Sequence, residues 1–410
     1  MQLISISPLF ISLELKSGID PRLSIYDEVL KALPAKSDEI TAPNRDKDPE
    51  RIDFSDLKQD DYDLRLLVWK PKPEENAPTT EFHIYSNGIC SVVVHLNLDD
   101  TITADQATEI SESTTKAEIS RYADRLNALL SDVYNKIPDR VLDTSRALEP
   151  VSESKIGWTS RAIVVEKDWL ERPPAKTFVT EWLSETLCPE DAERILKGEI
   201  SKSVTWVNYL VVNTPDFDAR EMIRVVRLAQ FFFAAQQELN MQTQRALIEA
   251  SLEKNVRKAN EILSRAREKM QHLTIQFNVQ RSFLRRSRKL ALDELLAAWD
   301  FDDLVKNGER MVKASTSKID QIVSARSERS AVITDLILAV IAFLIVIEVS
   351  LYFTEYSRQL MSNPALEYND NGRSWLLSAF ANFDTDSVLI GSALSLLTLV
   401  GLYAYWKLRK

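Results

Sequence analysis

The chain has 410 residues, of which 45% are hydrophobic and 27% charged, and its formal net charge is -10. This length predicts two or three structural units, and eight glycines beside so many charged residues favour long helices over an all-β fold. The pI of about 5.1, together with the lack of strands that interleave basic and aromatic residues, argues against a nucleic-acid partner.

The first 215 residues predict a cytoplasmic α+β domain. Its first strand is expected at residues 3–15, where apolar and polar residues alternate. This stretch contains Glu14, and no basic segment or cleavage site accompanies it, so we expect a strand and not a signal peptide. An acidic loop with prolines is expected over residues 34–62. Further strands are expected at residues 63–70, 82–85, 89–98, 158–166 and 204–212.

Two local motifs mark the ends of elements in this domain. Ser86, Asn87 and Gly88 separate two expected strands and predict a hairpin turn. Thr103 and Gln106 have the spacing of a capping box, which predicts a helix from residue 103 to about residue 136.

Side chains for acid–base or metal chemistry are scarce. The chain has three histidines and contains no phosphate-binding glycine loop, no G-x-S-x-G, no H-E-x-x-H and no C-x-x-C motif. His83 and His95 lie on neighbouring expected strands, but without a third ligand we expect packing or surface exposure and leave any metal unassigned. Cys90 and Cys188 are far apart and are expected to be reduced packing residues in a cytosolic compartment. We expect no enzyme and no cofactor.

Residues 216–307 contain neither glycine nor proline and predict a long helical stalk, bracketed by Pro215 and Gly308. A heptad-like seam within this stretch predicts that the long helix packs on partner helices. The seam consists of Leu228, Phe232, Ala235 and Leu239, and then of Leu252, Val256, Ala259, Leu263, Ala266, Met270, Leu273 and Phe277.

The stretch WDFDDLVKNG, residues 299–308, is expected to turn the chain, and a second helix is expected from residue 309 into an apolar run. The stripe of this second helix begins with Val312, Ser315, Ile319 and Ile322 and then reaches Arg326 and Arg329 near the run. These two arginines either contact lipid head groups or, in a ring of subunits, set the electric field at a channel mouth.

The densest basic cluster is the segment RSFLRRSRK, residues 281–289. It could bind a small phosphorylated ligand or anionic lipid, because guanidinium groups bind phosphate oxygens in pairs. The alternative is a solvated helix face that is tied up in salt bridges. The cations of this cluster are Arg281, Arg285, Arg286, Arg288 and Lys289.

Two apolar runs, residues 331–353 and 388–406, each have about the 20 residues that a helix needs to cross a bilayer. Basic residues precede the first run and follow the second, whereas the stretch between the runs has only two. This bias predicts an integral protein of the cell or inner membrane with both termini in the cytoplasm. The lipid bilayer is therefore an expected partner.

Two carboxylates, Asp335 and Glu348, interrupt the first run. They are 13 residues apart, which is about 20 Å along a helix and less than the ~30 Å of the hydrocarbon core. If the run spans, at least one of them lies at apolar depth, where acids normally face a bundle interior or a water-filled path. Alternatively, each lies near an end and is solvated by a local defect. About 220° of helical rotation separates the two, which excludes a continuous acidic stripe.

The second run has a stripe of small residues on one helix face, which predicts close packing on the first run or on a neighbouring subunit, or lining of a pore. This stripe consists of Ser387, Gly391, Ser395 and Thr398.

The segment between the runs, residues 354–386, contains GRSWLLSAFANF, which predicts an amphipathic helix on the membrane or over a pore. Trp375, Leu376, Ala379 and Phe383 form its apolar side. Asp384 and Asp386 follow, and they either concentrate cations at a pore mouth or serve as the cap of the second membrane helix and its neighbour.

This layout resembles the CorA-like family of two-span cation channels: strands and helices first, then a long helix returning along another, then a helix into the membrane and a short basic tail at residues 407–410. Members typically end the first span with Gly-Met-Asn, whereas this chain has Leu351-Tyr352-Phe353-Thr354-Glu355 and a connecting loop of 33 residues, 354–386. The resemblance implies a homo-oligomer with a cytoplasmic sensor domain, and the absent motif removes magnesium selectivity from that expectation.

The sequence thus predicts six segments and two classes of function. The first is an oligomeric channel or transporter for cations, gated by a ligand on the cytoplasmic domain. The second is a membrane-anchored coiled-coil effector or scaffold without conduction, such as a nucleotide-responsive defence effector. The segments are the α+β domain 1–215, the helical stalk 216–330, the spans 331–353 and 387–406, the loop 354–386 and the tail 407–410.

Overall fold

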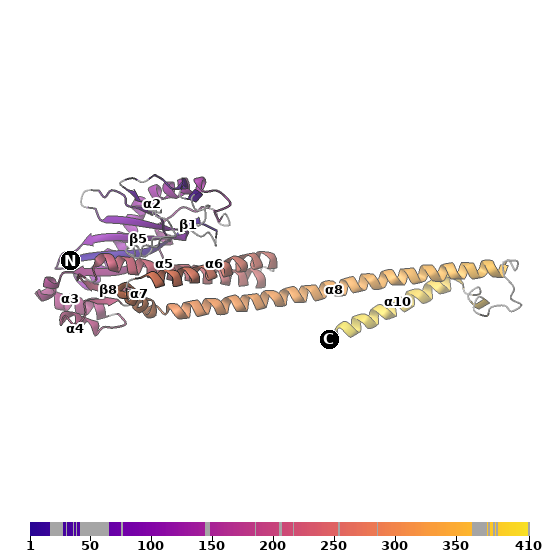
Figure 1. Ribbon diagram of the computed structural model, residues 1–410. Coiled ribbons are helices and arrows are strands. Elements are labelled where there is room, and N and C mark those ends of the chain that lie inside the picture. Colours follow the sequence, from indigo (N-terminus) through magenta and orange to yellow (C-terminus); the bar gives the residue numbers. More distant parts are fainter. Residues whose placement is uncertain are drawn as a thin grey trace. The chain divides into compact units, whose positions relative to one another are not determined.

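The protein divides into two compact units, Met1–Ile319 and Asp320–Lys410, each of which is considered by itself (Figure 1). The computed structural model describes residues 1–16, 28–29, 31–35, 37, 39–41, 65–74, 77–143, 148–184, 186–204, 207–215, 217–252, 255–284, 286–362, 375, 378–379, 382 and 384–408.

The first unit is built on a mixed β-sheet, which confirms the expected α+β body. Its described strands form one eight-stranded sheet in the order β2-β3-β4-β5-β1-β6-β8-β7. The pairing is antiparallel throughout, except that β6 and β8 run parallel. The strands are β1 (Gln2–Glu14), β2 (Ile40–Thr41), β3 (Arg65–Trp69), β4 (Thr79–Tyr85), β5 (Asn87–Asn97), β6 (Ser160–Val165), β7 (Lys202–Val204) and β8 (Asn208–Val212).

Helices cover both faces of this sheet, so nearly all of its central residues are buried. Because side chains alternate along a strand, Ile4 and Ile6 of β1 face one layer while Leu3 and Leu9 face the other. One layer consists of α2 (Ala104–Lys136), α3 (Pro173–Ser184) and α4 (Asp191–Leu196). The unit also contains two short 3₁₀ helices, Glu153–Lys155 and Lys167–Glu171.

The local sequence motifs of this unit are confirmed. Thr103 caps α2: its hydroxyl accepts from the Gln106 amide at 3.3 Å, and its own amide donates to the Gln106 side chain at 3.0 Å. Ser86 forms the turn between β4 and β5, and Gly88, at the start of β5, has a φ of 81°, a conformation that other residues rarely adopt. The stretch 204–212, expected as one strand, contains the end of β7 and all of β8, which pair with each other. Most of the acidic loop at 34–62 lies outside the residues that the structure describes.

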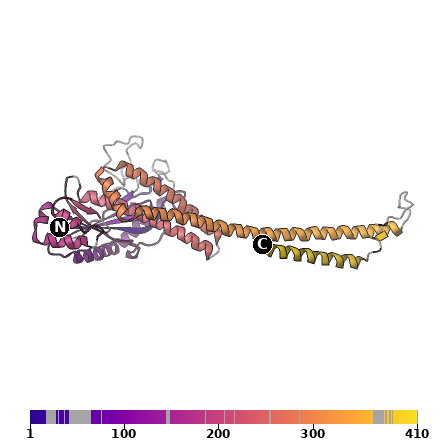
Figure 2. The same cartoon turned by 90° about the horizontal axis from the view of Figure 1, so that it is seen from below.

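The stretch 216–307 was expected to form one long helix before a turn at residues 299–308, but its described residues form three shorter helices and the start of a fourth. The helices are α5 (Ala219–Ser251), α6 (Val256–Phe283) and α7 (Arg286–Ala298). Asn255 provides the local reason for the first break, because its side chain accepts from the Lys258 amide at 3.2 Å and starts a new helix. Figures 1 and 2 show that α6 folds back along α5.

The predicted seam packs this helical hairpin, so its partner helices lie within the same chain. On α5, Leu228, Phe232, Ala235 and Leu239 are all at most 6% exposed. On α6, the residues from Ala259 to Leu273 that belong to the seam are likewise buried. Leu252 departs from the prediction, since it lies at the tip of the hairpin and is 76% exposed.

The turn before the next helix is shorter than the expected stretch 299–308, and it ends well before Gly308. The turn occupies Trp299 and Asp300, where Asp300 has a φ of 51°, and α8 (Phe301–Ser362) then runs through Gly308. Asp can adopt this left-handed conformation more readily than most residues. The expected helix start at residue 309 was therefore wrong by eight positions, because Gly308 lies inside α8, where it allows close contact with Gln236 and Asn240 of α5.

The second unit contains the remainder of α8 and the helix α10 (Thr385–Leu408). The apolar run 331–353 lies wholly within α8, and helical structure continues to Ser362. The apolar run 388–406 lies within α10. Of the expected amphipathic helix around Trp375, Leu376, Ala379 and Phe383, the structure describes only Trp375 and Ala379, and Leu376 and Phe383 lie outside the described residues.

Candidate functional site

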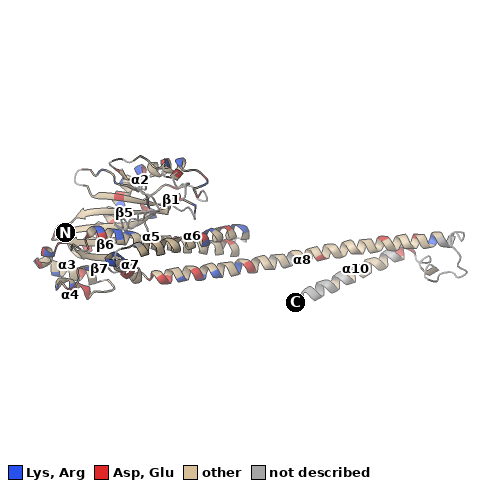
Figure 3. Ribbon diagram, in the orientation of Figure 1, with Lys and Arg blue, Asp and Glu red and all other residues tan. Residues whose placement is uncertain are grey.

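Among the described residues, one helix, α8, is long and apolar enough to cross a membrane by its length and composition. Figure 3 shows charged residues along the first part of α8 and few of them in the part that follows. Large apolar side chains in that later part are exposed: Ile337 is 54%, Leu344 58% and Val346 60% exposed. A soluble protein rarely leaves so much contiguous apolar surface in water, so this segment requires a cover.

The carboxylates of Asp335 and Glu348 lie on the exposed surface of this same apolar helical segment. Because helical backbone is continuous between them, the ideal spacing of about 20 Å and about 220° applies. A charged carboxylate in a lipid core costs on the order of 3 kcal/mol on insertion scales. The site therefore combines an apolar surface with two acids that point in different directions.

Several hydroxyl groups in the apolar helices donate to the backbone of their own helix. Thr334 donates to the Ser330 carbonyl at 3.0 Å, Thr354 to Ser350 at 2.8 Å and Ser395 to Gly391 at 2.9 Å. Such bonds to the preceding turn allow serine and threonine to enter an apolar environment without an external partner.

The small-residue stripe of the second run lies on α10, and all four of its members are exposed. Apart from its chain neighbours and the backbone of its own helix, no described heavy atom lies within 4 Å of a Cβ placed on Gly391. Ser395 and the Thr398 hydroxyl bond to carbonyls of their own helix. The stripe formed by Ser387, Gly391, Ser395 and Thr398 is thus free to approach another helix closely.

The expected charged residues at the ends of the apolar helices are placed only in part. Asp384 directly precedes α10 and Asp386 lies in its first turn, and both are exposed. A carboxylate at this position interacts favourably with the helix dipole. Arg326 and Arg329 belong to α8, but their side chains lie outside the described structure.

The basic cluster at 281–289 separates into paired and exposed cations. Arg281 makes a two-point ion pair with Asp293, with Nε and Nη2 at 2.7 and 2.9 Å from the carboxylate oxygens. Arg288 is 2% exposed and pairs with Glu221 in the same manner. Arg286 and Lys289 are exposed, and Arg285 lies outside the described residues. Of the four described cations of the cluster, two are therefore engaged in ion pairs and two are exposed.

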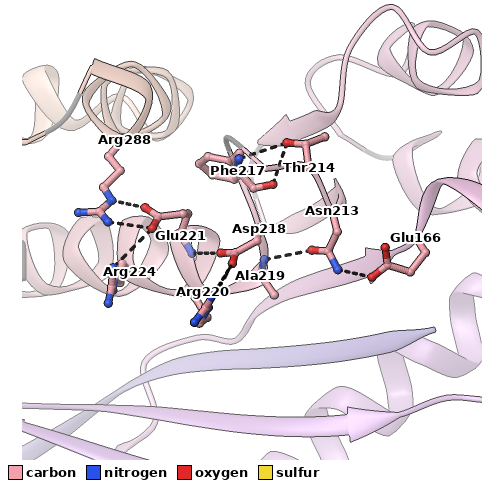
Figure 4. A network of polar contacts seen from close by, with 10 residues as sticks. All are labelled: Glu166, Asn213, Thr214, Phe217, Asp218, Ala219, Arg220, Glu221, Arg224 and Arg288. Atoms are coloured by element: carbon pink, nitrogen blue, oxygen red, sulfur yellow. Dashed lines mark hydrogen bonds and ion pairs between the residues drawn. The ribbon is translucent and has the colours of Figure 1, made fainter. Parts of the chain in front are cut away.

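Arg288 belongs to a polar network that surrounds the first turn of α5 (Figure 4). Asp218 accepts from the Glu221 amide at 3.0 Å and caps the helix. Asn213 connects this turn to the sheet, because it accepts from the Ala219 amide at 3.2 Å and donates to Glu166 at 2.6 Å. The network joins the ends of β6 and β8 to α5 and α7.

A second buried polar cluster, which the sequence did not predict, lies between β4 and α5. Arg227, 4% exposed, places Nη1 3.1 Å from both ring nitrogens of His83, and Glu81 Oε2 lies 3.0 Å from His83 Nε2. Lys70 pairs with Glu81 at 2.7 Å. His83 and Glu81 share this side of β4 because they are two residues apart. The only sign of this cluster in the sequence was Arg227, which lies among the apolar residues of the segment that forms α5.

Electrostatics keep His83 neutral in this cluster. Burial and the adjacent Arg227 guanidinium lower the pKa of His83 to about 3. Burial alone would raise the pKa of Glu81, but the hydrogen bond from His83 and the contact with Lys70 outweigh it and hold that pKa well below its usual range. Neutral His83 therefore donates from Nε2 to Glu81, and Nδ1 accepts from Arg227. His83 lies opposite Ser91, whereas His95 lies opposite Thr79, so the two histidines do not form a pair.

No family model matches the sequence, and neither a curated protein nor a solved structure matches it.

Proposed function

We propose that this protein is a homo-oligomeric membrane channel or transporter for cations, whose conduction is controlled by its α+β body. The observation that carries the proposal is the composition of α8. This helix starts among buried residues of the body, with Phe301 4% and Ile319 4% exposed, and it later contains the exposed apolar segment with Asp335 and Glu348. The continuous helical backbone of α8 thus connects the α+β body to the acidic residues Asp335 and Glu348, which we place in the membrane.

Lipid is the cover that best fits the apolar segment. Its exposed side chains are the aliphatic residues that partition into hydrocarbon. Tyr352, near the end of the run, is 70% exposed, and Tyr356, just beyond it, is 56% exposed. Tyrosine is enriched at the level of lipid head groups. In this proposal α10 supplies the second span, because its run of 19 residues from 388 to 406 has no charge.

The distribution of basic residues supports a cytoplasmic body. Lys313 and Lys318 precede the first run in α8, and Lys407 follows the second in α10. Arg358 and Arg373 are the two basic residues of the segment between the runs. By the positive-inside rule, both termini are cytoplasmic and the segment 354–386 lies on the opposite side.

Assembly follows from the two acids. A carboxylate that faces lipid is costly, and because about 220° separates Asp335 from Glu348, one lipid-exposed helix cannot turn both away from lipid. Packing of several copies around an axis lets one acid face a water-filled path and the other a neighbouring helix. The exposed stripe at Gly391 and Ser395 allows helices to approach closely in such an assembly.

The resemblance to CorA-like channels supports the same function. The chain has a sheet domain, a hairpin of long helices, a long helix that enters the apolar run, and a further apolar helix near its C-terminal residues. Without the Gly-Met-Asn motif, the proposal extends to cations as a class and not to magnesium. Two anionic carboxylates and the acidic pair Asp384 and Asp386 favour cations over anions in a ring.

The test begins with the oligomeric mass of the full-length protein in detergent, measured by light scattering with the micelle subtracted. A ring of four or more copies is expected. Ion flux into proteoliposomes is then measured for K⁺ and for Mg²⁺. We expect Asp335→Asn or Glu348→Gln to reduce flux by about tenfold or more, because the carboxylate charge that concentrates cations is removed.

A matched control replaces a carboxylate on the same helix outside the apolar run. Asp320→Asn, at an exposed position of α8, is expected to retain flux within about twofold. A monomer or dimer, or normal flux in both intramembrane variants at equal expression, would contradict the proposal. Replacing 331–406 with an unrelated two-span anchor then tests the scaffold alternative, which predicts that the activity of the body is retained.

A further inference from the structure

The contact between α5 and the start of α8 changes character along the helices. It begins with aromatic packing: the ring centroid of Phe233 lies 5.5 Å from that of Trp299 and 6.4 Å from that of Phe301. One and two turns further along α5, the buried residues are the carboxamides Gln236 and Asn240, which are 1% and 7% exposed. All of these residues belong to the first unit.

The two carboxamides form a hydrogen-bonded chain that ends on the backbone of α8. Gln236 Nε2 donates to Asn240 Oδ1 at 3.0 Å, and Asn240 Nδ2 donates to the Leu304 carbonyl at 3.1 Å. In a regular helix this carbonyl also accepts from the amide four residues on, that of Gly308. Asn240 therefore binds α8 at a defined turn of its backbone.

Gly308 is the residue that makes this contact sterically feasible. A Cβ at position 308 would lie 2.3 Å from Asn240 Oδ1 and 2.6 Å from Gln236 Nε2. Neither distance is tolerated by real side chains, so any residue with a Cβ would have to displace the carboxamides or the helix. With the carboxamides in their hydrogen-bonded positions, only glycine fits at this turn.

The surrounding turns of α8 do not provide a second position for Asn240. A shift of α8 by one turn, about 5.4 Å, would place Leu304 or Val312 in the position of Gly308. Their side chains would fill the space of the carboxamide and leave buried polar groups without partners, which is costly. Single buried carboxamides are known to specify helix register in this manner.

We propose that Asn240 and Gly308 form a register lock that holds α8 at one axial position on α5. The part of this inference that concerns conduction rests on the proposed function: axial movement of α8 during opening must release the lock. The lock itself is a property of the body and is measurable without ion flux.

Hydrogen exchange of the full-length protein in detergent tests the lock directly. Asn240→Ala removes a buried hydrogen bond, so amides in residues 304–316 are expected to exchange about fivefold faster. Gln244→Ala, an exposed carboxamide on the same helix, is the matched control and should leave these amides unchanged. Equal exchange in wild type and Asn240→Ala would overturn the lock.

A reversible cross-link tests the role in conduction. Asn240 Cγ lies 3.2 Å from a Cβ built at position 308, so the two Cβ atoms are at most about 4.7 Å apart, close to the separation in disulfides. Asn240→Cys with Gly308→Cys, in a Cys188→Ser background, is oxidised with diamide, which accepts the two electrons and two protons that the thiols lose. The bond is verified by mass spectrometry.

We expect oxidation to reduce cation flux at least about fivefold, and dithiothreitol to restore it, because the lock can then not open. Each single-cysteine variant should be insensitive to both reagents. Full flux in the oxidised double variant would overturn the role in conduction. If the wild-type protein shows no flux, the proposed function fails, and the exchange experiment still decides the lock.

Discussion

Arg288 and Glu221 form a two-point ion pair that joins α7 to the first turn of α5. The guanidinium is 2% exposed, whereas the carboxylate is 21% exposed and also lies 3.5 Å from Arg224. The pKa of Glu221 is lowered, mainly by the hydrogen bond from Arg288, although burial acts in the opposite direction. Glu221 thus neutralises a buried cation and lies at the positive end of the α5 dipole.

Glu221→Ala should destabilise the body by about 3 kcal/mol, because it leaves the Arg288 charge buried without its carboxylate. Urea unfolding of the full-length protein, followed by tryptophan fluorescence, measures this loss. Arg286→Ala removes an exposed cation from the same basic cluster and should change stability by less than about 0.5 kcal/mol. Similar losses in the two variants would show that the buried pair has no special role.

The buried state of His83 predicts a stability that falls with acid. Its pKa is lowered from 6.5 to about 3 on folding, so between these values the unfolded chain binds the proton that the folded chain excludes. Stability therefore rises with pH in this window and is lost as the pH falls below 6.5. The slope contributed by one such group approaches about 1.4 kcal/mol per pH unit.

His83→Gln should flatten this dependence between pH 6.5 and 4.5. Glu81 contributes below this range, because its stabilisation is lost only as the pH falls from 4.5 through its lowered pKa. The partly buried His95, whose pKa is also lowered, contributes a dependence of the same sign that remains in the variant. Urea midpoints measured at half-unit pH steps test the prediction, and identical slopes for both proteins would contradict it.

Gly308→Ala should destabilise the packing of α8 on α5 by about 1–3 kcal/mol, although alanine normally favours a helix. The added Cβ would lie 2.3 Å from Asn240 Oδ1. Gly401→Ala is the matched control, since apart from its chain neighbours and its own helix backbone no described heavy atom lies within 4 Å of a Cβ at that position. The helix should therefore be unaffected or slightly stabilised. Thermal unfolding of both variants gives the comparison. A gain of stability in Gly308→Ala would contradict the close contact.

Lys269 ties α6 to the sheet domain through two acids. Its Nζ lies 2.7 Å from Glu14 and 2.8 Å from Asp143, and all three side chains are at most 12% exposed. Lys269→Met should cost about 3 kcal/mol, because two carboxylates would remain without their cation. Adding Glu14→Gln and Asp143→Asn should recover part of this loss, while exposed Lys289→Met serves as the control. The free energy of urea unfolding measures each step, and no recovery would argue against an electrostatic cause.

Patterns with a short sequence span were predicted well. The alternation that defines β1, the capping box of Thr103 and the Gly88 turn each depend on residues a few positions apart. The seam through Phe232 and Leu263 was likewise visible, because helical packing repeats every three or four residues. Its partner could not be predicted, since a heptad pattern does not state whether the facing helix belongs to the same chain.

Charged residues were the hardest to place. The five cations at 281–289 formed one cluster in the sequence, but Arg288 and Arg281 pair with carboxylates that lie 67 and 12 positions away. Arg227 contacts His83 across 144 positions. Such pairs depend on how the helices pack on the sheet and on one another, and the residues next to each cation in the sequence do not predict that packing.

The sequence by itself determined the α+β body, the helical seam and a helix long and apolar enough to cross a membrane, because local periodicity and hydrophobicity are sufficient for these. Only the tertiary structure decided where the helical stretch breaks and what Gly308 does. Glycine often marks the end of a helix, but here α8 continues through Gly308, and the carboxamides of Asn240 and Gln236 occupy the positions that a Cβ would meet. That preference arises from a contact with another helix, which only folding brings into place.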